Sequence, residues 1–332
     1  MKHLTTNLLI AGALALGAQT AVAQSLSWDL ANEYPATSVH GQSAEIFAEK
    51  LAELSGGEIR ITLHHGSALG YKSVDHFDAV GDGALQLASS YVGSWGGIDP
   101  LFLLSSLPFV TPTSDDVWDL YQAAKPEYEM VLEENNQVML FATPWPPSGI
   151  WANKPVDSMD ELRNLKIRTY DANGTITLRA AGAAPIQLSW ADVIPQLTTG
   201  GIDAVLTSAE GGATASMWEH QSHFTEVTYA SPLQILHMNR DTYDSLTDEQ
   251  RAWVREAAEV GEAYGWKVLP ERVTQNYAQM RDNGMTIVEK IDADYMAALG
   301  EAGKEAVTEL KSRLGERGQV ILDAYEAARV GR

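Results

Sequence analysis

The chain has 332 residues, no cysteine, and an excess of acidic over basic side chains that gives a formal charge of −21 at pH 7. Such a charge repels nucleic acid and anionic membrane surfaces and argues against both as partners. It does not argue against a small anion, because the field inside a pocket is set by the few groups that line it. Without cysteine there are no disulfides, thiolate metal sites or cysteine nucleophiles, so the core alone must stabilise the fold.

Residues 1–23 have the pattern of a secretory signal peptide. Lys2 and His3 precede an apolar stretch from Leu8 to Leu16, and Ala21-Val-Ala23 matches a cleavage site with small residues. The apolar stretch is too short to cross a bilayer, and no later stretch is long enough. We therefore expect a mature protein that begins at Gln24 and works in the periplasm, without a lipid anchor.

Apolar patterns after residue 24 predict a β-α-β opening with a parallel sheet. Strands are expected at Leu26–Leu30 and Glu58–His64, with a helix from Ala44 to Leu54 between them. Further on, 76–90 and 193–208 follow the same order of helix, glycines, short strand and a pair of hydroxyl residues. This near-repeat favours two lobes with the hydroxyl pairs facing a cleft, although glycine-ended helices before strands are common in α/β proteins.

The prolines between Thr143 and Gly149 enforce an extended crossing from one lobe to the other. Thr247 and Gln250 form a capping box that begins a helix toward Met280, about 50 Å long and able to cross both lobes. Pro270 predicts a kink or an interruption in it. The expected lobes are 24–147 with 237–262 and 148–236 with 263–290, joined near Ser148, near His237 and by the long helix, and 291–332 form C-terminal helices packed on them.

Arg168 is the residue around which a binding site is expected. Ser158 and Glu161 form a capping box for a short helix, and the apolar residues Leu165 and Ile167 then alternate with charged ones as in a half-buried strand. Open α/β sheets present groups to a ligand at the carboxyl ends of their strands, and a guanidinium offers a fork of donors to a carboxylate. A surface arginine in a salt bridge would show the same pattern, so the strand alone leaves both interpretations open.

Three segments resemble the periplasmic solute-binding proteins of TRAP transporters, the DctP-like family. They are LRNLKIRT at 162–169, WADVIPQLTTGGIDAVLTS at 190–208 and LHMNRDTYDSLTDEQRAWVREAA at 236–258. The resemblance implies an α/β fold of two lobes, like that of periplasmic binding proteins, with parallel or mixed sheets, an interlobe cleft and a long lobe-spanning helix. It implies a subunit that delivers a small organic acid to membrane permease subunits. By the same resemblance, Arg168 clamps the carboxylate and Trp190 packs over the solute.

The remaining candidate residues are aromatic or small and polar. Members that bind sialic acid carry an arginine, a glutamate and an asparagine at the positions of Ser148, Ser89 and Thr207, so this site is less polar. One arginine with several aromatic residues suits a compact monocarboxylate, whereas a small zwitterion or amine held partly by a cation–π wall is the alternative. The predicted solute-binding residues are Arg168, Trp190, Ser89, Ser148, Thr207, Tyr91, Trp145 and Tyr170.

Catalytic and metal-binding motifs are missing from the sequence. It contains no nucleophile elbow, H-E-x-x-H, Walker loop or strand-linked G-x-G-x-x-G, so an exported enzyme is disfavoured. His220 and His223 have helical spacing, but no carboxylate set or cysteine completes a tetrahedral site around them. We expect a monomer without cofactor or metal. A sensing partner that binds without transport stays open, because the sequence does not separate sensing from transport.

Overall fold

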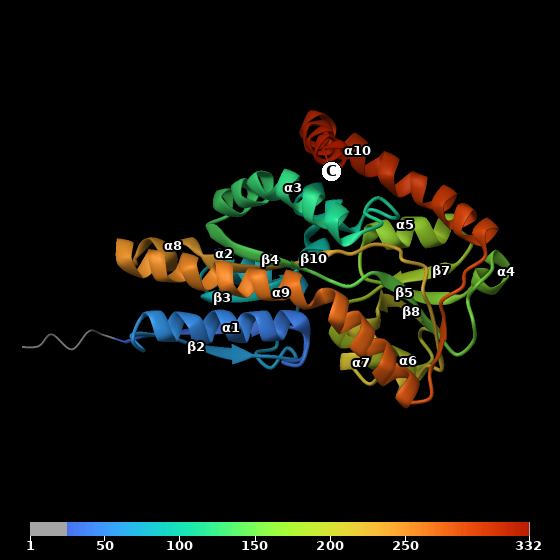
Figure 1. Cartoon of the computed structure of the whole chain (residues 1–332), viewed down its shortest axis with the longest axis horizontal. Helices are drawn as coiled ribbons and strands as arrows, with labels where there is room; N and C mark the ends of the chain where they lie inside the picture. Colours follow the sequence, from blue (N-terminus) through green and yellow to red (C-terminus); the bar gives the residue numbers. More distant parts are fainter. Residues whose placement is uncertain (1–24, 332) are drawn as a thin grey trace, which may run out of the picture.

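The computed structural model describes residues 25–331, and the predicted signal peptide lies outside this range. The first of its two mixed sheets has the strand order β2-β1-β3-β10-β4 (Figure 1). β1, β2 and β3 run parallel, and β10 runs antiparallel to both β3 and β4. The strands are β1 Leu26–Asn32, β2 Ile59–His64, β3 Leu87–Tyr91, β4 Gln137–Pro144 and β10 Leu233–Asn239.

The predicted β-α-β opening is confirmed, with two local differences. Helix α1 spans Val39–Leu54 and begins before Ala44, because the Ser38 side chain caps it by accepting the N–H of Gly41. Ser89 and Ser90 lie inside β3 rather than after it, since the strand is buried along its whole length and continues to Tyr91.

The second sheet has the strand order β11-β9-β5-β8-β6-β7. β6 lies between β7 and β8 and runs parallel to both, while β5 pairs antiparallel with β8 and β9. The carboxyl ends of β6 and β8 therefore lie at the same edge of this sheet. These are the strands that carry the predicted site residues Arg168 and Thr207. The strands are β5 Ser148–Ala152, β6 Lys166–Thr169, β7 Ala184–Gln187, β8 Ala204–Ser208, β9 His223–Thr225 and β11 Thr286–Val288.

The chain returns to the first sheet earlier than expected. β10 begins at Leu233, so residues 233–236, predicted for the second lobe, pair with β3 and β4. All seven residues of β10 are buried, and a strand covered on both faces lacks the alternation that would have marked its start. The other lobe boundaries stay a prediction.

Helix α9, Asp248–Asp282, spans both halves of the molecule. Its N-terminal capping box of Thr247 and Gln250 is present as predicted. It packs against α1 and β4 over its first part and against α7 further on, so that Val254 and Met280 lie in different hydrophobic cores. The helix continues through Pro270, and Figure 1 shows it bending between the part beside α1 and the part beside α7.

The remaining helices cover the sheets. α10, Ala293–Val330, packs on α3 and α5 and is divided by the non-helical Gly315 (Figure 1). The others are α2 Ser73–Gly81, α3 Ser114–Glu134, α4 Met159–Leu162, α5 Ala172–Ala180, α6 Val193–Thr199, α7 Ala209–Thr214 and α8 Arg240–Asp244. The 3-10 helices are η1 Val92–Trp95, η2 Pro100–Ser106, η3 Trp190–Asp192 and η4 Met217–Glu219. None of the helices in residues 25–331 combines the length and apolar character that a bilayer crossing requires.

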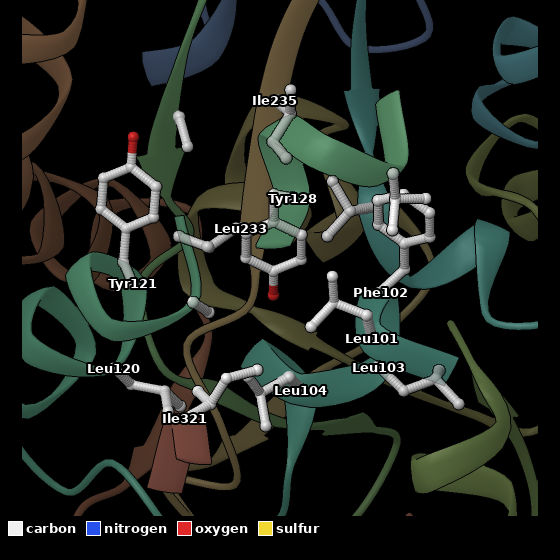
Figure 2. Packing of buried hydrophobic residues seen from close by; sticks show 14 of the residues in the cluster. Leu101, Phe102, Leu103, Leu104, Leu120, Tyr121, Tyr128, Leu233, Ile235 and Ile321 are labelled. Atoms are coloured by element: carbon white, nitrogen blue, oxygen red, sulfur yellow. The ribbon is translucent and has the colours of Figure 1, made fainter. Parts of the chain in front are cut away.

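The largest core of the first lobe is built on an apolar run, Leu101–Leu104, that follows Pro100. This run forms η2, and its side chains pack between α3, β10 and α10 (Figure 2). Each fully buried leucine or phenylalanine there contributes about 1.5–3 kcal/mol. The labelled members are Leu101, Phe102, Leu103, Leu104, Leu120, Tyr121, Tyr128, Leu233, Ile235 and Ile321.

A row of buried polar side chains crosses the first sheet. The His237 ring on β10 is hydrogen-bonded to Ser90 on β3 at 2.9 Å and to Gln137 on β4 at 2.6 Å. Ser90 also contacts His76 of α2 at 2.8 Å. Burial lowers the pKa of His76 to about 4 and that of His237 well below its ordinary value. Both rings are therefore neutral in the folded protein near pH 7.

The neutral histidines predict a loss of stability in acid. An unfolded histidine takes up a proton below about pH 6.5, whereas folded His76 does so only near pH 4, so stability falls as pH falls through this range. His76 alone accounts for about 3 kcal/mol. Chemical denaturation between pH 7.5 and 4 should show a shallower decline for His76→Gln than for the wild type.

The buried carboxyl groups of Asp171 and Glu210 act in the opposite direction, because burial raises the pKa of each. Both carboxyl groups are present in the wild type and in His76→Gln, so their contribution to the pH dependence of stability cancels when the two proteins are compared. His223→Gln, at a partly exposed ring that contacts Ser222, is the matched control. Equal slopes for the wild type and His76→Gln would contradict the prediction.

Candidate functional site

Ends of strands from both sheets meet around a small cavity. Tyr91 ends β3, Ser148 begins β5, and Arg168 and Thr207 lie in the last two positions of β6 and β8. The cavity has an empty volume of about 330 Å³. It is lined by Tyr34, Tyr91, Trp145, Ser148, Arg168, Tyr170, Trp190, Thr207, Ser208, Gly211 and Pro232.

A second cavity continues from the first. It has an empty volume of about 560 Å³ and shares five lining residues with the inner cavity, Arg168 among them. Its further lining includes Glu33 and Val74 from the first lobe and Gln187 and Leu188 from the second. We call the two spaces the inner and the outer cavity.

Arg168 lies at the junction of the cavities and is only 3% exposed, so the interpretation as a surface salt bridge is wrong. Its Nε donates to the backbone oxygen of Leu188 at 3.0 Å, and one terminal nitrogen donates to that of Leu206 at 3.3 Å. A guanidinium has five N–H donors, so three remain after these two bonds. They are available to a group in the cavity.

The charge of Arg168 is not neutralised by an ion pair with any carboxylate of residues 25–331; both of its hydrogen bonds go to backbone oxygens. Burial lowers the pKa of its guanidinium, and the nearby side chains of Tyr34 and Glu33 act against this. Arginine stays protonated nonetheless. A buried cation of this kind favours an anionic partner that enters the cavity.

Five of the eleven residues that line the inner cavity are aromatic. The guanidinium carbon of Arg168 lies 5.6 Å from the ring centroid of Trp190 and 5.8 Å from that of Tyr170. Tyr34 packs edge-on against Trp145 with their centroids 4.6 Å apart. The sequence analysis did not single out Tyr34, because Asn32 and Pro35 on either side of it are residues that favour turns. Its position two residues after the end of β1 was the available signal.

The Ser148 side chain and the bare backbone of Gly211 shape the rest of the inner cavity. The Tyr170 hydroxyl donates to Ser148 Oγ at 3.2 Å, which fixes both side chains in the wall. Gly211 leaves open the space beside Thr207, since a Cβ built there would lie 2.6 Å from Thr207 Oγ1. Nothing in the sequence marked Gly211, because its role depends on how α7 approaches β8.

Ser89 is the one predicted site residue that lines neither cavity. Its Oγ accepts a hydrogen bond from Gln234 Nε2 at 3.1 Å, and Gln234 Oε1 accepts one from the Trp145 indole at 3.3 Å. Ser89 therefore supports the Trp145 wall from behind. The seven other predicted residues are brought together, and their contact with a solute stays a prediction.

A hydrogen bond across the cleft holds Tyr91 in place. Its hydroxyl donates to Asp171 Oδ2 at 2.7 Å, and Asp171 Oδ1 caps α5 by accepting the N–H of Gly174 at 3.0 Å. Burial raises the pKa of Asp171, and these hydrogen bonds oppose the rise. The Gly93 backbone passes so close that a Cβ there would lie 2.1 Å from the Tyr91 hydroxyl.

Comparison with known families identifies the architecture. The chain matches the family described as bacterial extracellular solute-binding protein, family 7 (DctP), over residues 30–313. The chain belongs to this family. It is the solute-binding subunit of a TRAP transporter, not an enzyme, and it works outside the cytoplasm, as the sequence predicted. Membership implies membrane permease subunits as partners.

Solved structures and curated relatives of the DctP family agree with this fold. DctP6, a Bordetella pertussis extracytoplasmic solute receptor that binds pyroglutamic acid, matches with a TM-score of 0.87 and 29% identity, covering 91% of this chain and 99% of that one. A marine metagenome TRAP protein specific for pyroglutamate matches with a TM-score of 0.87 and 29% identity over 92% and 99%. The ectoine-binding periplasmic protein TeaA of Halomonas elongata is 26% identical over 98% of this chain and 96% of its own.

The bond between Tyr91 and Asp171 predicts a stability effect. Tyr91→Phe keeps the ring but leaves a buried carboxyl oxygen without this donor, which should lower the free energy of unfolding by about 2 kcal/mol. Urea denaturation at pH 7.5 measures it. Tyr264→Phe is the matched control, because that hydroxyl donates to Gln42 in a partly buried position and its loss should cost about 1 kcal/mol or less. Equal losses would contradict the prediction.

Proposed function

We propose that this TRAP subunit captures a compact monocarboxylate, with pyroglutamate as the first candidate, and delivers it to the permease. The observation that carries the proposal is the buried guanidinium of Arg168, which faces a small aromatic cavity with three donors to spare. DctP6 and the marine metagenome protein, each 29% identical to this chain, bind pyroglutamate.

The charge of the cavity supports one carboxylate rather than two. The residues lining the inner cavity include one cation, Arg168, and no acid. A single carboxylate therefore balances the one charge that lines the inner cavity. A second carboxylate would be buried without a partner, which costs several kcal/mol.

The shape and polarity of the inner cavity suit a small ring. The cavity is small, with an empty volume of about 330 Å³ that includes space open to solvent. Trp190, Trp145 and Tyr34 offer apolar faces to a ring, and the hydroxyl groups of Ser148 and Thr207 lie at the wall for a ring amide or another polar group. In this arrangement Arg168 makes a bidentate bond to the carboxylate and the ring lies among the aromatic side chains.

A cyclic zwitterion is the second candidate, favoured by the 26% identity to the ectoine-binding TeaA over nearly the whole chain. Aromatic walls can hold a cationic group. Glu33 is the one acid among the residues that line the two cavities. Both of its oxygens already accept backbone N–H groups, from Ser73 at 2.8 Å and Ala191 at 3.1 Å. This occupied carboxylate is why we rank the monocarboxylate first.

A thermal-shift screen of small acids, zwitterions and sugars tests the ligand class. A solute that binds only the folded protein stabilises it by about 2.7 kcal/mol at a hundred times its Kd. Pyroglutamate and similar monocarboxylates should raise the melting temperature more than dicarboxylates do. Shifts confined to ectoine-like zwitterions would select the second candidate, and shifts confined to sugars or cations would reject both.

Variants of Arg168 test its role. Arg168→Lys keeps the charge but loses the planar fork, and Arg168→Ala loses both, so the lysine variant should bind weakly and the alanine variant more weakly still. The alanine variant should lose affinity by about a hundredfold or more, equivalent to about 3 kcal/mol. Titration calorimetry with the strongest hit of the screen measures both.

Arg163→Ala is the matched control for these titrations. Arg163 is exposed and pairs with Asp160 at 3.0 Å on the surface, where an ion pair contributes at most about 1 kcal/mol. Its removal should leave the affinity unchanged. Wild-type affinity in Arg168→Ala would remove Arg168 from the site and end the carboxylate proposal.

A further inference from the structure

The neighbouring residues Lys72 and Ser73 face the neighbouring residues Ala191 and Asp192 at the edge of the outer cavity. Lys72 Nζ lies 2.9 and 2.8 Å from the two carboxylate oxygens of Asp192. Glu33 links Ser73 to Ala191. Its Oε2 accepts the N–H of Ser73 at 2.8 Å, and its Oε1 accepts the N–H of Ala191 at 3.1 Å. We call these five residues the mouth latch. It connects the start of α2 in the first lobe with η3 in the second.

The mouth latch lies next to two walls of the solute cavity. Tyr34 follows Glu33 in the chain, and Trp190 precedes Ala191. The ring centroids of Tyr34 and Trp190 are 6.1 Å apart, and Trp190 lies over Arg168. η3 has only three residues and no side chain caps its start, so the bond from the Ala191 N–H to Glu33 adds a first-lobe anchor beside Trp190, whose ring also packs on a second-lobe core.

The two parts of the mouth latch differ in their surroundings. Glu33 is 4% exposed, whereas the side chains of Lys72 and Asp192 are 34% and 43% exposed. Its hydrogen bonds are therefore shielded from water, while the ion pair is open to salt. Asp192 also raises the pKa of Lys72, so the lysine is charged throughout the physiological range.

We propose that the mouth latch positions Trp190 over the captured solute and slows its release. The proposal rests on the proposed function, because Trp190 must lie against the solute. Moving η3 away from α2 breaks the ion pair and the hydrogen bond that the Ala191 N–H donates to Glu33. These contacts form when the lobes close, a step that follows entry of the solute during capture, so their loss raises the dissociation rate and leaves the association rate nearly unchanged. Lys72, Asp192 and Glu33 are thus positioning residues.

Stopped-flow kinetics with pyroglutamate test the ion pair. Lys72→Gln and Asp192→Asn should each raise the dissociation rate by about fivefold, the factor expected of a partly exposed pair, with association changed by less than about twofold. The double variant Lys72→Asp/Asp192→Lys restores opposite charges and should return the rate toward that of the wild type. Added NaCl should speed release from the wild type but not from Asp192→Asn.

Lys304→Gln is the matched control, because it breaks the exposed pair with Glu301 within α10 and should leave both rates unchanged. Unchanged dissociation in both single variants would overturn the proposal. So would a charge-swapped variant that releases solute as fast as the single variants, or an effect confined to association.

A second measurement needs no solute. The chain has no cysteine, so Glu53→Cys on α1 and Asp160→Cys on α4 give single labelling positions on exposed side chains of each lobe. Distances between spin labels there should show a smaller closed population in Asp192→Asn than with Asp192 intact. Identical distributions would overturn the mouth latch. If the wild type binds no pyroglutamate, this measurement still decides the latch, and only the proposed ligand fails.

Discussion

The architecture depends on one buried positive charge. Arg168 is removed from water at the end of a strand in the second sheet, and its guanidinium bonds two backbone oxygens instead of a carboxylate. A cation in such a place is unfavourable unless an anion joins it. Under the proposed function, this buried cation gives the protein a physical reason to close around a carboxylate, and the aromatic walls give the rest of the solute a surface to pack on.

The cavity is also part of a hydrophobic core that both lobes share. Tyr34 and Tyr91 from the first lobe pack in the same cluster as Ile150 and Leu206 from the second. In the proposed closing movement, the cleft buries apolar surface as well as charge, and the hinge segments must permit this without disrupting the separate cores on either side. α9 spans both halves as one helix, which links the movement of the lobes to bending in a single element.

Sequence alone predicted the parts of the site that local patterns mark. Strand alternation and the capping box at Ser158 placed Arg168, and the family resemblance supplied its role and that of Trp190. Tyr34 was missing from the predicted site residues, because a turn pattern gives no sign of which side chain faces a cleft. Ser89 appeared to face the cleft because the near-repeat put it after a strand, whereas it lies within β3 and bonds Gln234. Lys72 and Asp192 are 120 positions apart, and no periodicity connects them.

The two bonds from Arg168 to the backbone of Leu188 and Leu206 determine where selectivity arises. Both oxygens belong to the second-lobe segment of the chain, so the arginine is oriented before a solute arrives and its side-chain entropy, about 2 kcal/mol, is lost during folding. A pre-organised guanidinium gives every carboxylate the same gain. Under the proposed function, discrimination between one monocarboxylate and another then depends on the fit of the solute's ring against Tyr34, Trp145 and Trp190. Changes in these aromatic side chains could redirect the subunit to a new acid while the charge recognition stays intact.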